Sequence, residues 1–412
     1  MSEMSYLEKL LDGVEVEWKT LEDISIKISS GGTPKTGVSE FYDGDIPWLR
    51  TQEVNFCDIW DTEVKITESG VKNSSAKWIP KNCVIVAMYG ATVGKIGINK
   101  IPMTTNQACA NIQLNEEVAH YRYVFHFLCS QYTYIKSLGT GSQTNINAQI
   151  VKIPIPCPDN PEKSLAIQSE IVRILDTFTA LTAELSAELN MRKKQYNYYR
   201  DQLLSFKEGE VEWKTLGEIG HFTRGKRFVK TDMLSEGYPC IHYGEMYTYY
   251  NVWTNKTKSF VSQELASKLR VSEYGDVIIV AAGETIEDIG KGTAWLGKSN
   301  VVFHDACFSY RCLLNPKYIA YFTRTKIFHD QIKKHISSGK ISAINANGLS
   351  KVKIPMLSAK EQARIVEILD KFDTLTNSIT EGLPREIELR QKQYEYYRDL
   401  LFSFPKPETI SN

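Results

Sequence analysis

The sequence repeats itself, and this repeat constrains the fold more than any other feature. EVEWKTL occurs at residues 15–21 and again at 210–216, 195 positions later. The apolar run NCVIVAMYG at 82–90 likewise corresponds to GDVIIVAAG at 275–283. Chance identity over seven residues that include a tryptophan is negligible. A period of this length predicts two related halves, each with the same elements in the same order.

Each half runs from short strands to a long helix. The β-branched runs Val84–Val86 and Val277–Val280, bounded by Gly, Asn and Asp, predict strands. The proline-rich stretch PIPCPDNP at 154–161 favours neither helix nor central strand and marks a domain edge. Both halves then end alike, in YNYYRDQLLSF at 196–206 and YEYYRDLLFSF at 394–404.

The helices show an apolar stripe whose steps alternate between four and three residues. In the first half the stripe consists of Ile171, Leu175, Phe178, Thr182, Leu185, Leu189, Arg192, Tyr196, Tyr199 and Leu203. In the second half it consists of Ile365, Leu369, Phe372, Thr376, Ile379, Leu383, Ile387, Arg390, Tyr394, Tyr397 and Leu401. Such spacing is typical of coiled coils, and two helices of about 38 residues in one chain most simply pair antiparallel. The alternative is that each helix is buried against its own domain.

Consecutive steps of four beside Gly382 and Pro384 predict local unwinding or a kink in the second helix.

Composition sets the broad class. With 412 residues, 42% hydrophobic and 24% charged, the chain suits two or three ordinary globular domains. We expect no membrane span and no signal peptide, and the eight singly placed cysteines indicate a reduced, cytoplasmic protein. The net charge of +0 gives no support to nucleic-acid binding, although it permits local basic patches or a partner that supplies phosphate contacts.

Catalytic motifs do not emerge from the sequence. GATVGK at 90–95 has one residue too few for a P-loop, and Ile96 stands where a magnesium-binding Ser or Thr is needed. His120 and His126 are spaced for different helical faces, so we expect no metal site from them. Asn315-Pro316 continues with Lys317 and lacks the aromatic platform for a flipped adenine. The chain is therefore interpreted as a recognition or scaffolding protein without catalytic residues.

Four stretches of the first half are distinctive, namely SSGGTPKTGVSEFYDGDIPWL (29–49), YGATVGKIGI (89–98), TTNQA (104–108) and TGSQTNI (140–146). They resemble a target-recognition domain from the specificity subunits of type I restriction-modification enzymes, and this resemblance covers essentially the whole chain. The TAEL–SAEL tract at 182–189 and the YYRDQLLSF tail resemble the IC subclass.

The resemblance implies an α+β protein in which two pseudo-symmetric α/β target-recognition domains are separated by two long antiparallel coiled-coil helices. The expected segments are a helical N-terminus (1–15), recognition domain 1 (16–160), a central helix (161–208), recognition domain 2 (209–358) and a C-terminal helix (359–412). Each domain would read one half of a bipartite DNA site. Two methyltransferase subunits would methylate adenine N6, and two restriction subunits would complete the endonuclease. S-adenosylmethionine, ATP and Mg²⁺ would serve the holoenzyme, with none bound by this chain.

Candidate DNA contacts lie at turns where the two halves differ, because amide, arginine and lysine side chains can read base edges. In the first half we select Thr33, Lys35, Arg50, Tyr89, Thr92, Lys95, Asn106, Gln107, Gln143 and Asn145. In the second half we select Arg224, Lys226, Arg227, His242, Tyr243, Glu284, Thr285, Lys291, His304 and Asp305. We expect Trp48, Trp78 and Trp295 to belong to the core. The second domain lacks the GGTP and IPWL stretches, which predicts different half-sites.

Rival interpretations lack their signatures. A dimeric transcriptional regulator would show a helix-turn-helix or a basic region, and a free-standing methyltransferase would carry its own motifs. A purely structural coiled coil would not need two β-containing domains.

If the helix separates the half-sites along the DNA, a third TAEL-like unit would add ~6 Å, or one to two base pairs, to the spacer.

Overall fold

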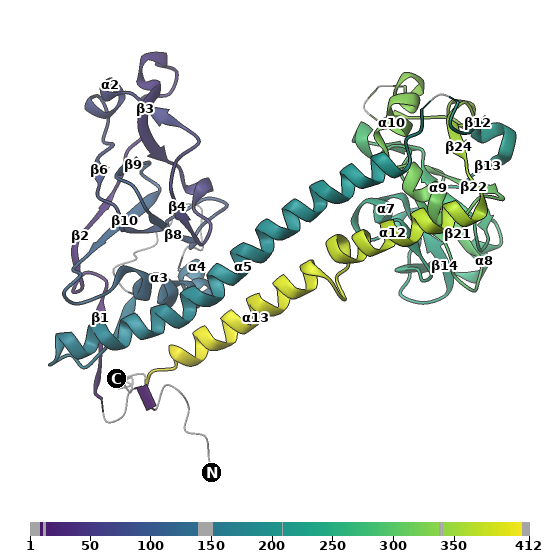
Figure 1. The fold of residues 1–412 in the computed structure, drawn as a ribbon. Helices are drawn as coiled ribbons and strands as arrows, with labels where there is room; N and C mark the ends of the chain where they lie inside the picture. The colour runs from purple at the N-terminus through teal and green to yellow at the C-terminus, as the bar shows by residue number, and fades with distance from the viewer. Residues whose placement is uncertain are drawn as a thin grey trace, which may run out of the picture. The chain divides into compact units, whose positions relative to one another are not determined.

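A computed structural model describes residues 9–10, 14–138, 151–207, 209–337, 339 and 341–405. The chain divides into two compact units (Figure 1). Unit 1 comprises residues up to 184 together with those from 387 onward, and unit 2 comprises residues 185–386. One helix, α5 (Pro161–Leu203), begins in unit 1 and ends in unit 2. The residue boundaries that we predict for the five segments remain a prediction.

Unit 1 contains three sheets. A two-stranded sheet pairs β1 (Val16–Thr20) with β11 (Lys152–Pro156). The five-stranded sheet has the order β2 (Ser25–Ser30), β10 (Cys109–Leu114), β7 (Val84–Ala87), β8 (Ile96–Asn99) and β4 (Cys57–Ile59). The four-stranded sheet has the order β5 (Lys65–Ile66), β3 (Tyr42–Leu49), β9 (Met103–Thr105) and β6 (Trp78–Ile79). The helices of this domain are α2 (Glu68–Lys72), α3 (Tyr121–Ser130) and α4 (Tyr132–Ser137), with 3-10 turns η1 (Ser39–Phe41) and η2 (Thr51–Glu53).

Unit 2 repeats these sheets strand for strand. The pair is β12 (Glu212–Thr215) with β24 (Lys353–Met356). The five-stranded order is β13 (Gly220–Arg224), β22 (Cys307–Cys312), β18 (Val277–Val280), β20 (Gly292–Trp295) and β15 (Trp253–Thr254). The four-stranded order is β16 (Ser259–Val261), β14 (Tyr238–Ile241), β21 (Val301–Phe303) and β17 (Val271–Ser272). A further pair joins β19 (Ala282–Gly283) to β23 (Ser342–Ala343).

The short helices of unit 2 surround these sheets. They are α6 (Leu216–Ile219), α7 (Tyr243–Thr248), α8 (Gln263–Ala266), α9 (Pro316–Phe322), α10 (Lys326–Ile332) and α11 (Ala346–Ser350), with 3-10 turns η4 (Lys230–Asp232), η5 (Ile286–Asp288) and η6 (Lys333–His335). The predicted pseudo-symmetric α+β fold is confirmed, because parallel and antiparallel pairings also match between the units, as in β3 beside β9 and β14 beside β21.

The absence of IPWL from the second half does not remove its strand. In unit 2 the segment YPCI forms β14, which occupies the place of the IPWL end of β3. Arg50 follows β3 and His242 follows β14, and each residue precedes a helical turn. The two halves therefore keep the backbone and change the side chains that follow this strand.

The long helices differ from each other in continuity. The helix α5 runs unbroken for 43 residues. Its counterpart is interrupted after Asn377, so α12 (Ala359–Asn377) and α13 (Leu383–Leu401) have 19 residues each. The break falls beside Gly382, which adopts a positive φ of 81° that favours glycine. The predicted kink is confirmed, and the stripe residue Ile379 within it is 74% exposed instead of packed.

Within each unit a part of α5 packs beside the returning helix, which runs in the opposite direction (Figure 1). In unit 1 the rings of Phe178 and Tyr397 stack at 5.2 Å. In unit 2 the ring of Phe372 stacks on Tyr196 at 6.3 Å and on Tyr199 at 5.6 Å. Paired helices are therefore present in both units.

The end of each long helix completes the core of a recognition domain that it does not follow directly. Tyr394 and Leu401 of α13 belong to the core of unit 1. Tyr196 of α5 and the adjacent Leu204 belong to the core of unit 2. The repeated YYRD segments are thus the places where helix ends meet the two domains, and the alternative of helices buried only against their own domains is wrong.

Smaller expectations have mixed outcomes. GATVGK forms the turn between β7 and β8, with Gly90 and Gly94 at positive φ. Trp48 and Trp295 are buried, but Trp78 is 52% exposed, so its assignment to the core is wrong. Because side chains alternate along a strand, Ile79 faces the core and Trp78 faces outward. No described helix is both long enough and apolar enough to cross a membrane.

Candidate nucleic-acid interface

Unit 2 contains an open cavity of about 710 Å³, which we call the reading cavity. Its walls come from the segment after β13, from α7, from the segment after β18 and from the turn between β21 and β22. Most of the residues selected for the second half line it, namely Arg227, His242, Tyr243, Glu284, Thr285, His304 and Asp305. The fold thus brings together turns that are as much as 78 positions apart, from 227 to 305.

Aromatic rings form one side of the reading cavity. The rings of His242 and His304 lie 4.6 Å apart between centroids. Phe228 meets them edge-on at 5.7 and 5.4 Å, and Tyr243 lies 4.9 Å from His304. This packing fixes the rings of both histidines, and His304 is further held by a hydrogen bond to the backbone of Phe228.

Backbone contacts assign the tautomer of these histidines. Nδ1 of His242 accepts a hydrogen bond from the N–H of Gly244 at 3.2 Å, and Nδ1 of His304 accepts one from the N–H of Ala306 at 3.1 Å. A nitrogen that accepts carries no proton, so in the neutral rings the proton is on Nε2. Although Nδ1 of His304 also lies 3.1 Å from Asp305 Oδ1, the bond from Ala306 already uses its lone pair, so this approach is not an ion pair.

Both histidines are neutral near pH 7. Burial, together with the charges of His304 and Lys230, lowers the pKa of His242 to about 4, against the opposite effect of Asp305. Burial also lowers the pKa of His304. The ring edges in the cavity therefore act as hydrogen-bonding groups and not as fixed positive charges.

Charged residues of both signs line the rest of the reading cavity. Arg227 and Lys230 are exposed on one side, and Glu284 is exposed on another. Donors of this kind suit acceptor atoms on guanine, while a carboxylate suits the amino group of cytosine. The arrangement can distinguish base edges, whereas a uniformly basic surface would bind only the backbone.

Three selected residues of unit 2 lie outside the reading cavity and hold local structure. Arg224 Nε donates to the carbonyl of Asp305 at 3.0 Å, and Lys226 Nζ donates to the carbonyl of Lys268 at 2.8 Å. Lys291 Nζ pairs with Asp288 Oδ1 at 2.5 Å. Arg224 thereby supports the turn that carries Asp305.

Unit 1 builds the matching turn with different side chains. Asn106 Oδ1 accepts a hydrogen bond from the N–H of Ala108 at 3.2 Å, just as His304 does in unit 2. Beside it, Thr33 Oγ1 donates to Gln107 Oε1. The amide groups of Asn106 and Gln107 thus stand where the histidine and aspartate stand in the second half.

The other selected residues of unit 1 gather around η2 or lie exposed. Arg50 pairs with Glu63 at 2.7 Å and with Glu53 at 3.4 Å. Thr92 Oγ1 donates to the carbonyl of Thr51 at 2.7 Å, and Lys95 Nζ donates to Asn55 Oδ1 at 2.9 Å. Lys35 and Tyr89 are exposed. Gln143 and Asn145 lie outside the described residues.

Sequence reasoning missed part of the cavity. Phe228, Lys230 and Tyr247 line it, and Tyr247 anchors α7 by donating to the carbonyl of Ala282 at 3.0 Å. Tyr243 and Tyr247 are four positions apart, so helical spacing from a selected residue would have found the latter. Phe228 and Lys230 follow Arg227 by one and three positions, but no periodic signal marks them. Among the described residues no cluster of His, Cys, Asp and Glu suits a metal ion.

Comparison with known families decides the identity. Residues 13–191 and 208–389 both match the family described as type I restriction modification DNA specificity domain. The chain belongs to the type I restriction-modification specificity subunits. It is 42% identical to the specificity subunit of the Escherichia coli type I restriction enzyme EcoR124I/EcoR124II, over 100% of both chains. Specificity subunits recognise DNA, and the catalytic activities of these systems lie in partner subunits.

Solved specificity subunits share the fold. The crystal structure of the S subunit from M. genitalium has a TM-score of 0.53 at 16% identity, covering 98% of this chain and 100% of that one. A chain from a study of complex assembly and conformational transition in the type I R-M system has a TM-score of 0.61 at 15% identity, covering 94% and 97%. At these identities the likeness is one of fold alone.

Proposed function

We propose that this specificity subunit reads a bipartite, asymmetric DNA site, with one half-site for each unit. The observation that carries the proposal is the turn shared by both halves, which holds Asn106 and Gln107 in unit 1 and His304 and Asp305 in unit 2. Amide side chains suit adenine, whereas a neutral histidine beside a carboxylate offers a different set of donors and acceptors. An identical scaffold with different reading groups gives two unlike half-sites.

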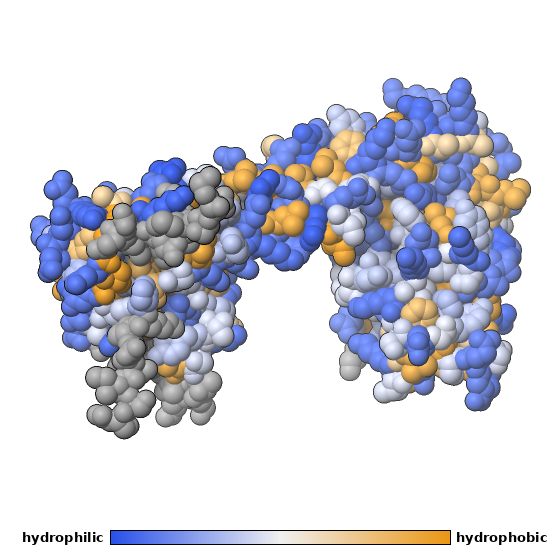
Figure 2. Space-filling view, turned by 90° about the horizontal axis from the view of Figure 1, so that it is seen from below, coloured by the Kyte–Doolittle hydropathy of each residue, from blue (hydrophilic) through white to orange (hydrophobic). Residues whose placement is uncertain are grey.

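We further propose that the chain works in the cytoplasm with two methyltransferase subunits, and with two restriction subunits in the endonuclease. The methyltransferases would methylate adenine N6 with S-adenosylmethionine, and the restriction subunits would use ATP and Mg²⁺. The exposed sides of the helices support docking, because Met191 and Tyr198 of α5 are each 61% exposed and Tyr396 of α13 is 66% exposed. Orange side chains interrupt the blue ones along the helices in Figure 2. Large exposed apolar groups are typical of surfaces that partners cover.

Mapping methylated adenines tests this function. Cells that carry the chain with its methyltransferase partner should methylate one bipartite sequence with unlike halves, and cells without the chain should not. Inserting a third four-residue unit into Thr182–Leu189 should leave both half-sites unchanged and lengthen the spacer by about one or two base pairs, because four helical residues add ~6 Å. This tract lies inside the continuous helix α5, at the division between the units.

A symmetric site, or methylation that is independent of the chain, would contradict the proposed function. A replacement of Glu188 by Gln, which preserves helix length, serves as the control for the insertion. It should change neither the half-sites nor the spacer.

A further inference from the structure

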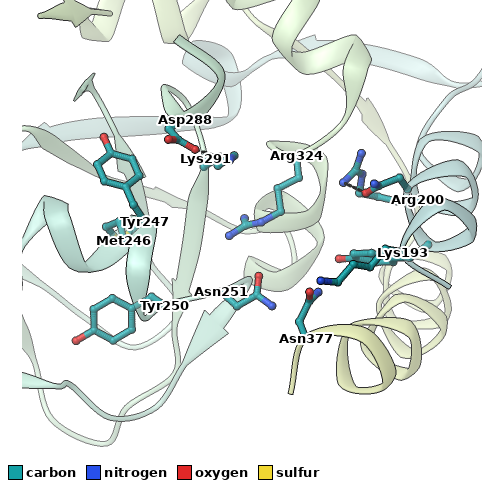
Figure 3. A pocket seen from close by; sticks show the side chains of 12 residues that line it. Lys193, Arg200, Met246, Tyr247, Tyr250, Asn251, Asp288, Lys291, Arg324 and Asn377 are labelled. Carbon is teal, nitrogen blue, oxygen red and sulfur yellow. Dashed lines mark hydrogen bonds and ion pairs between the residues drawn. The ribbon is translucent and has the colours of Figure 1, made fainter. Parts of the chain in front are cut away.

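A second pocket of unit 2, of about 400 Å³, lies between α5, α7, the end of α9 and the end of α12 (Figure 3). Four of its lining residues are basic, namely Lys193, Arg200, Lys291 and Arg324. Asp288 is the acidic lining residue, and it pairs with Lys291 at 2.5 Å. The lining therefore carries an excess of positive charge, which contrasts with the net charge of +0 for the whole chain.

Arg324 lacks a carboxylate partner among the described residues. Its Nη1 donates to the carbonyls of Gly292 and Ala320, the latter at 3.0 Å, while Nε and Nη2 make no hydrogen bond there. The side chain extends from the end of α9 into the middle of the pocket (Figure 3). Burial lowers the pKa of Arg324. A half-buried guanidinium that faces a pocket without an anion is poorly compensated, so its donors point to a negatively charged ligand.

The nearby carboxylate of Asp373 is already engaged. Its Oδ1 accepts hydrogen bonds from the amide groups of Asn251 at 2.8 Å and of Asn377 at 2.9 Å. Burial raises the pKa of Asp373, which favours its neutral form. The charges of Asp373 and Arg324 act on each other's pKa, but the two side chains do not form an ion pair.

Tyr196 provides an independent sign of a ligand. Its side chain is 6% exposed and lines the pocket, and its hydroxyl has no hydrogen-bond partner. Buried hydroxyls are nearly always bonded, and leaving one unbonded costs about 1–3 kcal/mol. In unit 1 the matching hydroxyl of Tyr394 bonds to Nδ1 of His126 at 2.9 Å. In the second half Tyr321 replaces this histidine, and Arg324 stands three positions further along the chain.

We propose that this pocket binds a phosphate group, and that in the DNA complex this group is a backbone phosphate beside the second half-site. The guanidinium of Arg324, the ammonium of Lys193 and the hydroxyl of Tyr196 offer more donors than the two oxygens of a carboxylate use well, and they suit a phosphate. Arg200 also lines the pocket, but it is paired with Asp201 at 3.0 Å. Tyr247 and Asp288 line both this pocket and the reading cavity, so a duplex read there passes close by. The backbone assignment rests on the proposed function, whereas the phosphate assignment does not.

Thermal unfolding of the full chain tests the phosphate site without DNA. Inorganic phosphate should raise the unfolding temperature above that in chloride or acetate of equal ionic strength. Arg324→Gln should weaken phosphate binding at least about tenfold, and Tyr196→Phe about threefold to tenfold, because charged hydrogen bonds contribute more than neutral ones. Tyr394→Phe is the matched control from unit 1 and should leave the phosphate-induced shift unchanged.

Three results would overturn the phosphate site: no shift beyond chloride, an equal shift in acetate, or equal phosphate binding by wild type and Tyr196→Phe. The acetate result would assign the pocket to a carboxylate. If Arg324→Gln fails to fold, Lys193→Gln at the exposed rim replaces it and should weaken phosphate binding about twofold to threefold.

Salt dependence of duplex binding then identifies the source of the phosphate. In the complex with methyltransferase subunits, Arg324→Gln should make the slope of log K against log salt less negative by about 0.9, the value for one lost phosphate contact. An unchanged slope with lost phosphate binding would overturn the backbone assignment and leave a free phosphate compound as the ligand. A complex that binds no DNA at all would refute the proposed function while the unfolding result stands.

Discussion

In unit 1 the hydroxyl of Tyr394 donates to Nδ1 of His126, and Nε2–H of His126 donates to Asp176 at 2.7 Å. In unit 2 the matching positions hold Tyr196, Tyr321 and Asp370. There the hydroxyl of Tyr321 donates to Asp370 at 2.7 Å, while the hydroxyl of Tyr196 stays unbonded. The matching tyrosines at the helix ends thus differ in bonding. In unit 1 the hydroxyl of Tyr394 belongs to a continuous hydrogen-bond network, whereas in unit 2 the hydroxyl of Tyr196 is left out of it.

Two tyrosines fix the correspondence between the halves. Tyr123 in α3 and Tyr318 in α9 each donate to the carbonyl of a proline, Pro154 and Pro355, at 2.7 and 2.9 Å. Counting from them, Arg122 matches Lys317, and both cations pair with the aspartate of the following helix, at 2.6 and 2.7 Å.

The same alignment places Cys129 opposite Arg324. Burial raises the pKa of the Cys129 thiol to about 12, so this position is uncharged in unit 1 and cationic in unit 2. The repeat is conserved where helix and domain must pack, and it diverges where the pocket faces a ligand. The two halves therefore share the contact between helix end and domain, but they differ in the charge of the side chains beside it.

Placing an arginine at the unit 1 position that matches Arg324 should have the largest effect on stability. Cys129→Arg would place a guanidinium in a buried position near Arg122 and Arg398, which already carry positive charge, so we expect unit 1 to lose at least about 4 kcal/mol. Hydrogen exchange measured by mass spectrometry reports each unit separately, which a single melting curve does not. Cys129→Ala is the control and should cost about 1–2 kcal/mol. If unit 1 of the arginine variant kept its native protection from hydrogen exchange, the two helix-to-domain contacts would be interchangeable.

Removing the central aspartates should have the next largest effect and should separate the two networks. Asp176→Ala leaves both Arg122 and buried His126 without this partner, so unit 1 should lose about 3 kcal/mol. Asp370→Ala strands Lys317 and the hydroxyl of Tyr321, but Lys317 still lies 4.1 Å from the ring of Trp253, so unit 2 should lose about 2 kcal/mol.

Hydrogen exchange of each unit measures both losses. The exposed pair of Glu367 and Lys371 is the control, and Glu367→Ala should change stability by less than about 0.5 kcal/mol. Equal losses from both aspartate variants would contradict the difference that we draw between the networks.

Acid should distinguish His242 from Arg50, which occupies the same place in unit 1. The folded pKa of His242, about 4, lies below the unfolded value of about 6.5, so the unfolded chain takes up the proton first. This contribution to stability is complete above about pH 6.5 and is lost as the pH falls toward 4, amounting to about 2 kcal/mol by pH 5.

The measurement is the unfolding free energy of unit 2 between pH 7 and pH 5 for wild type and His242→Asn. Asparagine keeps an acceptor for the N–H of Gly244 but does not titrate. The variant should therefore show a pH slope smaller by this amount. Equal slopes would mean that His242 is more accessible to solvent than its packing indicates.

Much of the fold could be predicted because each signal is local or repeated. The valine and isoleucine runs predicted β7 and β18, and the consecutive steps of four beside Gly382 predicted the helix break. The reading cavity was partly predictable, since comparing the turns at Asn106 and His304 exposes where the halves diverge. Trp78 was misplaced because its exposure depends on which side of a short strand faces outward.

The phosphate pocket had no sequence signal. Tyr196, Lys291 and Arg324 come from three distant segments, and only the packed fold brings them together. Arg324 stands out because it faces a pocket without a carboxylate partner among the described residues, and Tyr196 differs from Tyr394 because its hydroxyl has no hydrogen-bond partner. The lack of a hydrogen-bond or ion-pair partner can be recognised only in the folded structure, where all neighbouring side chains are known.

The division of the chain also has a consequence for protein synthesis. Unit 2 is one continuous segment, 185–386, but unit 1 needs both the start of the chain and residues from 387 onward. Tyr394, Leu401 and Phe402 leave the ribosome after all of unit 2, and they enter the core of the domain that was made first. At ~5–20 residues per second, the first domain waits on the order of 10–40 s for its final helix. Unit 2, which is translated second, can therefore complete its core first, and the nascent first half keeps an open apolar face until residues 387–402 have been synthesised.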